Sequence, residues 1–550
     1  MVKRWLAIGA LLLLVIQTII QVKLADTDSQ TTDEAVHLSA GYTYLTRGDW
    51  RFNPEHPPLV KILAALPLLA IKPHVTTEME DAWAKSSDLS YDSWKENRAF
   101  GEAMLYKAGN NPDQLLFWGR MPMVALTLLL GLVIFWIAYK HWGATAALTA
   151  TALYTLNPIV NGHGHLITTD IAISLGFLLS VYSFWQLLER PTWRWSLLWA
   201  LAFGFSLLVK HTAIILLPTF LVLLAISLIQ QRRGFDWRQV LLKSAVGLLL
   251  VWALVWAGFG FHDNVSGYKM VRTSNPDPVV ITDPKMDPDD TLSRSISRLL
   301  PANYLKGLSL VIDHASDGHI SYLLGQESLT GWWYYFPILF LLKTPLAMLI
   351  IFGGAAYLIV ARQPRSSLVI GLVASGAVFL LVAMDSKANL GVRHILPIFP
   401  LLTLASAWAV TVDQRFRTAT FALLAWLLAT SVLSYPTYLG YFNELAGGSK
   451  NGYKIATDSN LDWGQDLKRI KIYVDAHPNE KPYVDYSWAG RSSLDYYLGA
   501  ENYQSIENWQ PGMTGLAIFG ATAYNFPPFN EHCIDLEKIA PGLFSCWLTN

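Results

Sequence analysis

Charged residues are scarce in this sequence. Only 15% of its 550 residues are Asp, Glu, Lys or Arg, whereas 53% are hydrophobic, and the mean hydropathy is +0.31. Soluble domains carry about 25% charged residues. A soluble chain of this composition would need an unusually large buried core, whereas a lipid bilayer accepts apolar helix surface directly. The shortage of charge therefore predicts an integral membrane protein.

The sequence also lacks a surplus of basic residues. Lys and Arg together number 41, as do Asp and Glu, so the formal net charge is zero. Binding to nucleic acid needs a positively charged surface that neutralises phosphates. We therefore expect no nucleic acid partner.

The usual signatures of cofactors and metals are missing as well. No glycine-rich dinucleotide loop follows an expected strand, and the only two cysteines, Cys533 and Cys546, lie near the C-terminus. His163, His165 and Asp170 come closest to a metal-binding set, but their spacing is not that of a metal motif. We expect no cofactor and no metal.

What the sequence does contain is a series of long apolar runs. About eleven runs are long enough to cross a hydrocarbon core of about 30 Å as helices. They cover residues 5–21, 115–139, 144–159, 169–188, 195–209, 213–229, 240–261, 337–360, 368–384, 395–410 and 419–439. The first run could be mistaken for a secretory signal, but no small-residue cleavage site follows it, so we expect a retained anchor.

The basic residues of the short loops indicate the orientation. They fall in alternate loops, and cationic loops stay in the cytoplasm. These residues are Lys3, Arg4, Lys140, Arg190, Arg194, Arg232, Arg233, Arg238, Arg362, Arg365, Arg415 and Arg417. The pattern predicts a multi-pass protein of the plasma (inner) membrane with a cytoplasmic N-terminus. The segments 23–114, 262–336 and 440–550 are expected on the outer, periplasmic side.

Residues 440–550, here called the tail, differ in composition from residues 1–439. The tail is polar and rich in turn signals, and its short apolar runs 483–488 and 515–519 favour strands, whereas 461–473 favours a helix. We expect a membrane domain over 1–439, followed by a small outer domain of mixed α/β structure. Cys533 and Cys546 are close in sequence and are expected to face an oxidising compartment, so we expect a disulfide between them.

Ionisable residues collect at the outer ends of the apolar runs. Asp33 and Glu34 begin a helical pattern in the first outer segment, and His56 precedes two prolines that fix its backbone. Further along the chain come His163, His165, Asp170, Lys210, His211, Lys387, Arg393 and His394, with Lys343 inside the eighth run. Each alone could be a helix cap, a turn or an interface residue, but ionisable groups at membrane depth are costly unless they are paired or functional.

Carboxylates and cations on one membrane face suit transfer from a lipid phosphate. Cations can hold a phosphate leaving group, and a carboxylate can remove the proton of an acceptor. A transporter would place its charges near the midplane, beside broken helices in corresponding halves. A non-catalytic component of polysaccharide export would share the topology but would not need Asp33 together with the cations.

At these residues the chain resembles the lipid-carrier-dependent glycosyltransferases of family 39, which include protein O-mannosyltransferases and the aminoarabinose transferases of lipid A. The resemblance covers the membrane part. It rests on Asp33-Glu34, His56-Pro57-Pro58-Leu59, His165 with Thr169-Asp170, Lys210-His211, the stretch 331–337, Leu342-Lys343-Thr344-Pro345 and Arg393-His394-Ile395-Leu396-Pro397. It implies the GT-C fold, with about eleven transmembrane helices.

The resemblance also implies a role for each residue that matches. Asp33 would be the base or acceptor-orienting group with Glu34 as its partner, and Asp170 would be the second acidic position. Lys210, Arg393 and Lys343 would hold the carrier phosphate, whereas His56, His211 and His394 would line the substrate pocket. The implied donor is a sugar on polyprenyl phosphate, attacked with inversion, and the acceptor is a lipid, a protein or a glycan.

The alternation of basic loops yields a testable topology. A reporter that is active only outside the cytoplasm should work when it is fused after Asn550 and fail when it is fused at Arg233. The reverse pattern of activities would overturn the orientation.

Overall fold

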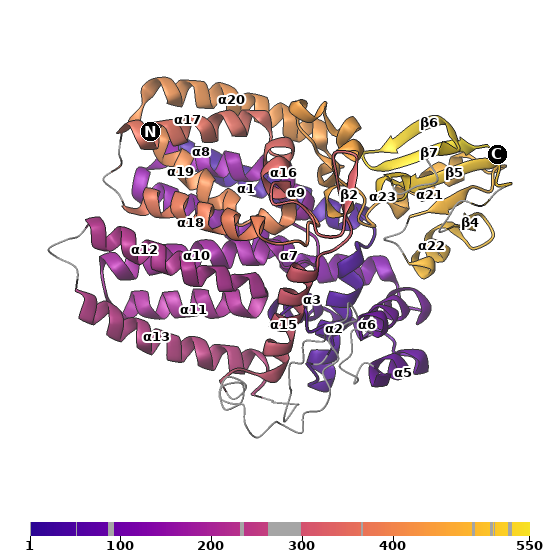
Figure 1. Cartoon of the computed structure of the whole chain (residues 1–550), viewed down its shortest axis with the longest axis horizontal. Helices are drawn as coiled ribbons and strands as arrows, with labels where there is room; N and C mark the ends of the chain where they lie inside the picture. Colours follow the sequence, from indigo (N-terminus) through magenta and orange to yellow (C-terminus); the bar gives the residue numbers. More distant parts are fainter. Residues whose placement is uncertain are drawn as a thin grey trace.

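The computed structural model of the chain is dominated by α-helices, most of which run side by side in one bundle (Figure 1). The structure describes residues 2–50, 52–85, 93–230, 236–261, 299–362, 364, 367–486, 490–506, 510, 512–525 and 531–549. Three of the basic residues used for the orientation lie outside this part: Arg232, Arg233 and Arg365. So do 262–298 of the second outer segment.

Seven helices in the described ranges are long and apolar enough to cross a membrane. They are α1 (Val2–Thr27), α7 (Pro112–Trp142), α10 (Asp170–Glu189), η2 with α12 (His211–Gln230), α13 (Trp237–Gly258), α18 (Ser367–Met384) and α20 (Gln414–Ser434). The expected multi-pass membrane protein is confirmed.

Three of the eleven predicted runs form shorter helices than a full span needs. These are α8 (Ala144–Thr155, 12 residues), α11 (Trp193–Val209, 17 residues) and α19 (Ile398–Val412, 15 residues). At about 1.5 Å per residue, a 12-residue helix reaches only about 18 Å. Every predicted run contains a helix, but the number long enough to span is seven, or eight with one bent pair.

The bent pair corrects the prediction for the eighth run. Instead of one span over 337–360, α16 (Tyr335–Lys343) and α17 (Leu346–Arg362) meet at an angle of 112°. Pro345 causes the break, because it donates no backbone hydrogen bond and disfavours helical backbone at Thr344, which is extended. Lys343 therefore lies at the end of a short helix and not inside a continuous span.

The outer segments gather at the end of the bundle away from the N-terminus (Figure 1). The first segment forms α2 (Thr32–Arg47), α3 (Leu59–Ala65), α4 (Leu68–Ile71), α5 (Thr77–Lys85), α6 (Ser93–Glu102) and η1 (Ala103–Lys107). Shorter outer elements are α9 (Pro158–His163), α15 (Ala302–Asp317), η3 (Val392–Ile395) and the hairpin β1 (Ser321–Leu323) and β2 (Gln326–Ser328). Which membrane face this end meets stays a prediction.

The tail begins with short helical turns that lie on the bundle and ends in a small sheet. The turns are η4 (Tyr438–Gly440), η5 (Glu444–Ala446), η6 (Ser449–Lys454) and η7 (Asp458–Asn460). The sheet has the order β4-β3-β5-β7-β6, from strands β3 (Tyr483–Asp485), β4 (Gln504–Ser505), β5 (Gly515–Gly520), β6 (Cys533–Ala540) and β7 (Leu543–Leu548). Helices α21 (Leu467–Ala476), α22 (Arg491–Leu498) and α23 (Ala521–Asn525) accompany it.

Mixed α/β structure in the tail is thereby confirmed. Strand β3 pairs in parallel with β4 and β5, whereas β5, β7 and β6 pair antiparallel. The side chains of Val484, Ile518, Leu467 and Ile470 form the core between the sheet and α21. Helix α21 begins six residues later than the predicted 461–473, because residues 461–466 lie against the membrane part instead. The last residues of the predicted strand 483–488, Ser487 and Trp488, lie outside the described part.

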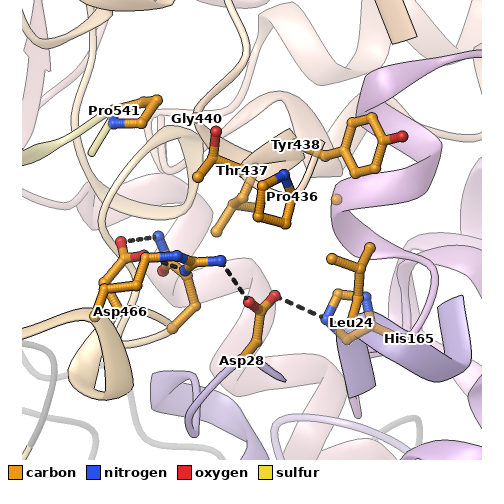
Figure 2. Close-up of a pocket in the computed structure, with 13 residues that line it drawn as sticks. Leu24, Asp28, His165, Pro436, Thr437, Tyr438, Gly440, Asp466 and Pro541 are labelled. Atoms are coloured by element: carbon orange, nitrogen blue, oxygen red, sulfur yellow. Dashed lines mark hydrogen bonds and ion pairs between the residues drawn. The ribbon is translucent and has the colours of Figure 1, made fainter. Parts of the chain in front are cut away.

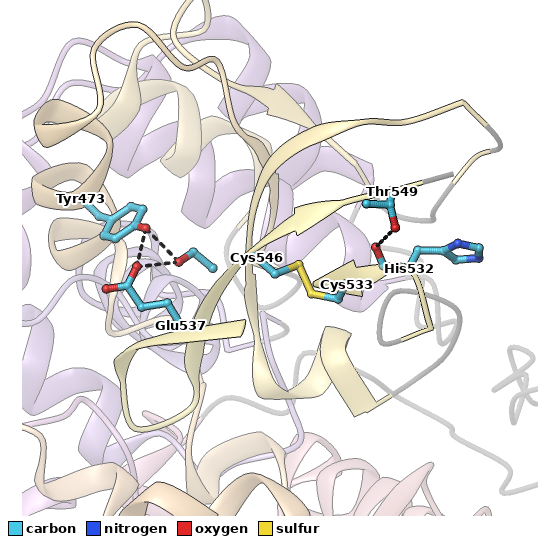
Figure 3. Close-up of a disulfide and its surroundings, with 7 residues drawn as sticks. Tyr473, His532, Cys533, Glu537, Cys546 and Thr549 are labelled. Carbon is cyan, nitrogen blue, oxygen red and sulfur yellow. Dashed lines mark hydrogen bonds between the residues drawn. A yellow bond between two sulfur atoms is a disulfide. The ribbon is translucent and has the colours of Figure 1, made fainter. Parts of the chain in front are cut away.

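A disulfide joins Cys533 on β6 to Cys546 on β7, with their Cα atoms 5.6 Å apart (Figure 3). The bond closes a short loop at the end of the tail. Replacing both cysteines with alanine should therefore destabilise the tail by about 2–3 kcal/mol and leave activity largely unchanged. Mass spectrometry of the unreduced protein tests the bond directly, and alkylation of both thiols without reduction would rule it out.

Candidate functional site

Asp33 and Glu34 lie in the first turn of α2 but face different surroundings, because successive residues of a helix point about 100° apart. Glu34 is fully buried and forms a bidentate ion pair with Arg120 of α7, at 2.6 and 2.8 Å. It also accepts the backbone N–H groups of Thr31 and Ile167. Glu34 is therefore held in the protein interior and is not the neighbouring partner of Asp33 that the sequence predicts.

Asp33 joins a group of four charged residues, here called the ion-pair cluster: Asp33, Asp170, Lys210 and Arg393. Arg393 Nη1 donates to Asp33 Oδ2 at 2.9 Å and lies 3.7 Å from Asp170 Oδ2. Lys210 Nζ donates to Asp170 Oδ1 at 2.7 Å. The Asp170 side chain is completely buried, whereas the Asp33 side chain is 24% exposed. Asp33 is thus the more accessible of the two carboxylates.

Besides the start of α2, which carries Asp33, three elements build this cluster. Asp170 is the first residue of α10, where the helix dipole favours a negative charge, and Lys210 directly follows α11, which packs against α10. Arg393 lies in η3, between α18 and α19. Gly391 allows η3 to come close to the tail, since a Cβ there would collide with Ser459 Oγ. The bundle thereby brings together charges that lie far apart in the sequence.

Two histidines lie beside Asp33. Nδ1 of His37 donates to the carbonyl of Ile167 at 2.8 Å, and the His37 and His56 rings meet edge to face at 5.1 Å. Burial lowers the pKa of His37, although Asp33 opposes the shift, and burial places the pKa of His56 well below its usual value. Both imidazoles are therefore neutral at pH 7. His56 was predicted as a site residue, whereas His37 was not.

Glu55 is a further carboxylate that the sequence reasoning did not single out. Glu55 lies in the turn directly before His56. Lys61 holds this turn, because its Nζ donates to the carbonyls of Asn53 and His56 at 2.6 Å each. Burial and the charge of Asp33 raise the pKa of Glu55 to about 7, against the opposing charge of Lys61. The sequence signal that could have identified Glu55 is its position directly before His56-Pro57-Pro58.

The remaining predicted residues differ in their surroundings. His211 packs against Tyr304 with ring centres 4.9 Å apart, and His394 packs against Phe336 at 6.4 Å. Lys343 is buried and turned away from the cluster: its Nζ donates to the carbonyls of Leu439 and Asn460. This geometry favours a structural role for Lys343 and not the predicted contact with phosphate.

Two tail residues complete the surroundings of Arg393. Arg393 Nε donates to Ser459 Oγ at 3.2 Å, and the guanidinium lies over the ring of Trp463 with Cζ 4.1 Å from the ring centre. The sequence reasoning missed both, because the resemblance that identified the other site residues ends before the tail.

His163 and His165 do not converge with Asp170 on one point. His165 Nε2 lies 3.1 Å from Asp28 Oδ2 at a small cavity, and Arg469 pairs with the other oxygen of Asp28 (Figure 2). His163 instead packs near Trp463. Within the described ranges, no group of three or more His, Cys, Asp or Glu has an arrangement that could hold a metal ion.

Comparison with known proteins connects this geometry to a fold. Residues 113–256 match the family model described as dolichyl-phosphate-mannose-protein mannosyltransferase. The crystal structure of ArnT from Cupriavidus metallidurans bound to undecaprenyl phosphate matches with a TM-score of 0.51 at 13% identity, over 98% of this chain and 97% of that chain. The chain has the GT-C fold. The resemblance stated from the sequence is thereby confirmed.

A second solved structure also matches. The archaeal oligosaccharyltransferase AglB from Archaeoglobus fulgidus, in complex with an inhibitory peptide and a dolichol-phosphate, has a TM-score of 0.43 at 12% identity, over 93% of this chain and 69% of that chain. No curated protein matches the sequence significantly. In this GT-C chain, the family match includes Asp170 and Lys210 of the ion-pair cluster but neither Asp33 nor Arg393.

The raised pKa of Glu55 has a consequence for stability. Between about pH 4.5, its ordinary value, and about pH 7, the folded protein holds a proton that the unfolded chain has lost, so stability should fall as pH rises through this window. Glu55→Gln removes the titrating group. We expect the melting temperature of the variant in detergent to vary less between pH 5 and pH 8 than that of the wild type.

Glu78→Gln is the matched control, because the Glu78 side chain is 61% exposed on α5. It should keep the pH dependence of the wild type. Equal pH dependence in Glu55→Gln and the wild type would contradict the assignment.

Proposed function

We propose that this protein is an integral membrane glycosyltransferase that moves a sugar from a polyprenyl-phosphate-linked donor to an acceptor hydroxyl on the outer face of the plasma membrane. The observation that carries the proposal is the ion-pair cluster, in which two cations and two carboxylates meet at the end of a GT-C bundle. The family model and the lipid phosphate bound by ArnT support it.

Lys210 and Arg393 are suited to hold the phosphate of the donor. Their charges are balanced by Asp170 and Asp33, so an arriving phosphate must compete for them. Asp170 is fully buried and paired with Lys210 at 2.7 Å, whereas Asp33 is partly exposed and held by Arg393. The phosphate would therefore displace Asp33 more easily than Asp170. Displacement leaves the Asp33 carboxylate free to accept a proton.

The reaction is then a single displacement. The acceptor oxygen attacks the anomeric carbon, the bond between this carbon and the phosphate oxygen breaks, and the acceptor proton passes to Asp33. Lys210 and Arg393 stabilise the charge that develops on the departing polyprenyl phosphate. Attack opposite to the leaving group inverts the anomeric centre. The neutral His37 and His56 rings would line the pocket without adding charge.

The acceptor is a lipid, a protein or a glycan that brings its hydroxyl to Asp33. The charges of the cluster lie at helix ends and not at mid-helix, which favours a transferase over a transporter. An assay of sugar hydrolysis or transfer from polyprenyl-phosphate sugars, on purified protein, tests this choice. If the purified protein shows no transfer and no hydrolysis with any sugar donor, this result would favour a transporter or a non-catalytic export component.

The role of Asp33 can be tested by Asp33→Asn. Asparagine keeps the shape of aspartate but cannot act as a base, and the N-cap of α2 is Thr31, so the substitution leaves the cap in place. We expect turnover to fall by on the order of 100-fold or more, with little change in melting temperature. Donor binding should persist because Lys210 and Arg393 remain.

Asp26→Asn is the matched control, because Asp26 lies seven residues earlier with its side chain 62% exposed. It should transfer sugar at the wild-type rate. A well-folded Asp33→Asn protein with near-normal turnover would contradict the role of Asp33 as the base, and Asp170 or Glu55 would become the next candidate.

A further inference from the structure

The start of the tail is buried against the membrane part. Residues 458–467, here called the linking segment, join η7 to the first residue of α21. Seven of these residues are at most 2% exposed. They are Ser459, Asn460, Leu461, Asp462, Trp463, Asp466 and Leu467. Such burial in a polar stretch indicates a packed element with defined partners and not a loose connection.

On one side the linking segment holds Arg393. Ser459 accepts from Arg393 Nε and itself donates to the carbonyl of Leu390 at 3.0 Å, while Trp463 covers one face of the guanidinium. Asn460 Oδ1 accepts the backbone N–H of Val392, the residue before Arg393, at 3.0 Å. The tail thus fixes the side chain of this arginine and the backbone of the residue before it.

On the other side the linking segment holds the start of α2. The carbonyl of Trp463 accepts the backbone N–H of Thr32, the residue before Asp33, at 3.0 Å. Gly464 has a φ of +110°, and its carbonyl accepts the hydroxyl of Ser29 at 2.8 Å. A side chain at Gly464 would collide with the carbonyl of Gln30. The same short segment therefore touches the residues that carry Asp33 and Arg393.

Lys343 fastens the linking segment from the side of the bundle. Its buried ammonium donates to the carbonyls of Asn460 and Leu439 and lies 4.6 Å from the centre of the Phe442 ring. A buried cation is stable only with such partners. These contacts account for a buried lysine that does not reach the ion-pair cluster.

The position of Arg393 determines which of its donors can meet a ligand. Nε donates to Ser459 and Nη1 donates to Asp33, while an oxygen of Asp170 lies 3.7 Å from Nη1. No described residue accepts a hydrogen bond from Nη2, so this nitrogen remains for a phosphate oxygen. Without the ring of Trp463 and the hydroxyl of Ser459, the guanidinium could rotate and lose this arrangement.

We infer that Ser459 and Trp463 are positioning residues of the phosphate site, and that the tail belongs to the catalytic machinery instead of only covering the outer face. The inference rests on the proposed function, since it takes Arg393 as a ligand of the donor phosphate. The linking segment would keep the Arg393 guanidinium oriented toward the phosphate when Asp33 is displaced from it.

The test measures binding of undecaprenyl phosphate to the full-length protein in detergent. Trp463→Leu removes the aromatic face, and a cation–π contact of about 1–2 kcal/mol corresponds to about 5- to 30-fold weaker binding. Trp463→Phe keeps a ring and should restore most of the affinity. Ser459→Ala should weaken binding about 3- to 10-fold, in line with the net contribution of one typical hydrogen bond. Trp547→Leu is the control, because Trp547 is 43% exposed on β7.

Melting temperatures, measured in parallel, separate positioning from folding. Weaker binding by Trp463→Leu at an unchanged melting temperature, with rescue by Trp463→Phe, supports the inference. Wild-type affinity in Trp463→Leu and Ser459→Ala overturns it and leaves the proposed function intact. Should Trp463→Leu not fold, Ser459→Ala decides on the same criterion. A wild-type protein that binds no undecaprenyl phosphate overturns the proposed function and the inference together.

Discussion

Arg120 and Glu34 form a completely buried ion pair, and the end of the bundle that carries the ion-pair cluster is organised around it. Arg120 also donates to three backbone carbonyls where α1 ends, and Glu34 accepts the backbone N–H groups of Thr31 and Ile167. A buried ion pair is stable only when the remaining hydrogen-bonding groups of both partners are satisfied. Here they tie α1, α2, α7 and the approach to α10 to one point. Loss of either partner would leave a buried charge at a cost of about 3–5 kcal/mol.

This constraint explains how two adjacent acids come to differ. With Glu34 fixed in the interior, the helical geometry of α2 turns Asp33 toward Arg393. The loop before Asp170 is tied to the same ion pair through Ile167. The two carboxylates of the ion-pair cluster are therefore positioned by one buried contact, although 137 residues of sequence separate them in the chain.

The four charges of the cluster sum to zero when both carboxylates are ionised. Asp33, Arg393, Asp170 and Lys210 alternate in sign, so each charge has an opposite neighbour and none is left alone in a poorly solvated site. The proposed donor phosphate would take the place of the Asp33 carboxylate beside Arg393, which is the more accessible of the two carboxylates. The tail adds the aromatic face and the hydroxyl that hold Arg393, so the tail and the membrane part both contribute to the surroundings of the cluster.

Composition and apolar runs determined from the sequence alone that this is a helical membrane protein with a mixed α/β tail, since these depend on local hydropathy and periodicity. The residue types at the helix ends also indicated Asp33, Asp170, Lys210 and Arg393. Only the tertiary structure decided that Glu34 and Lys343 face the interior, and that Glu55, His37, Ser459 and Trp463 surround the cluster. The direction of a side chain depends on partners up to several hundred residues away, as for Arg393 and Asp33, and no local pattern carries that information. The break between α16 and α17 shows the same limit. Average hydropathy is hardly changed by one proline, whereas the backbone cannot continue as a regular helix through Pro345.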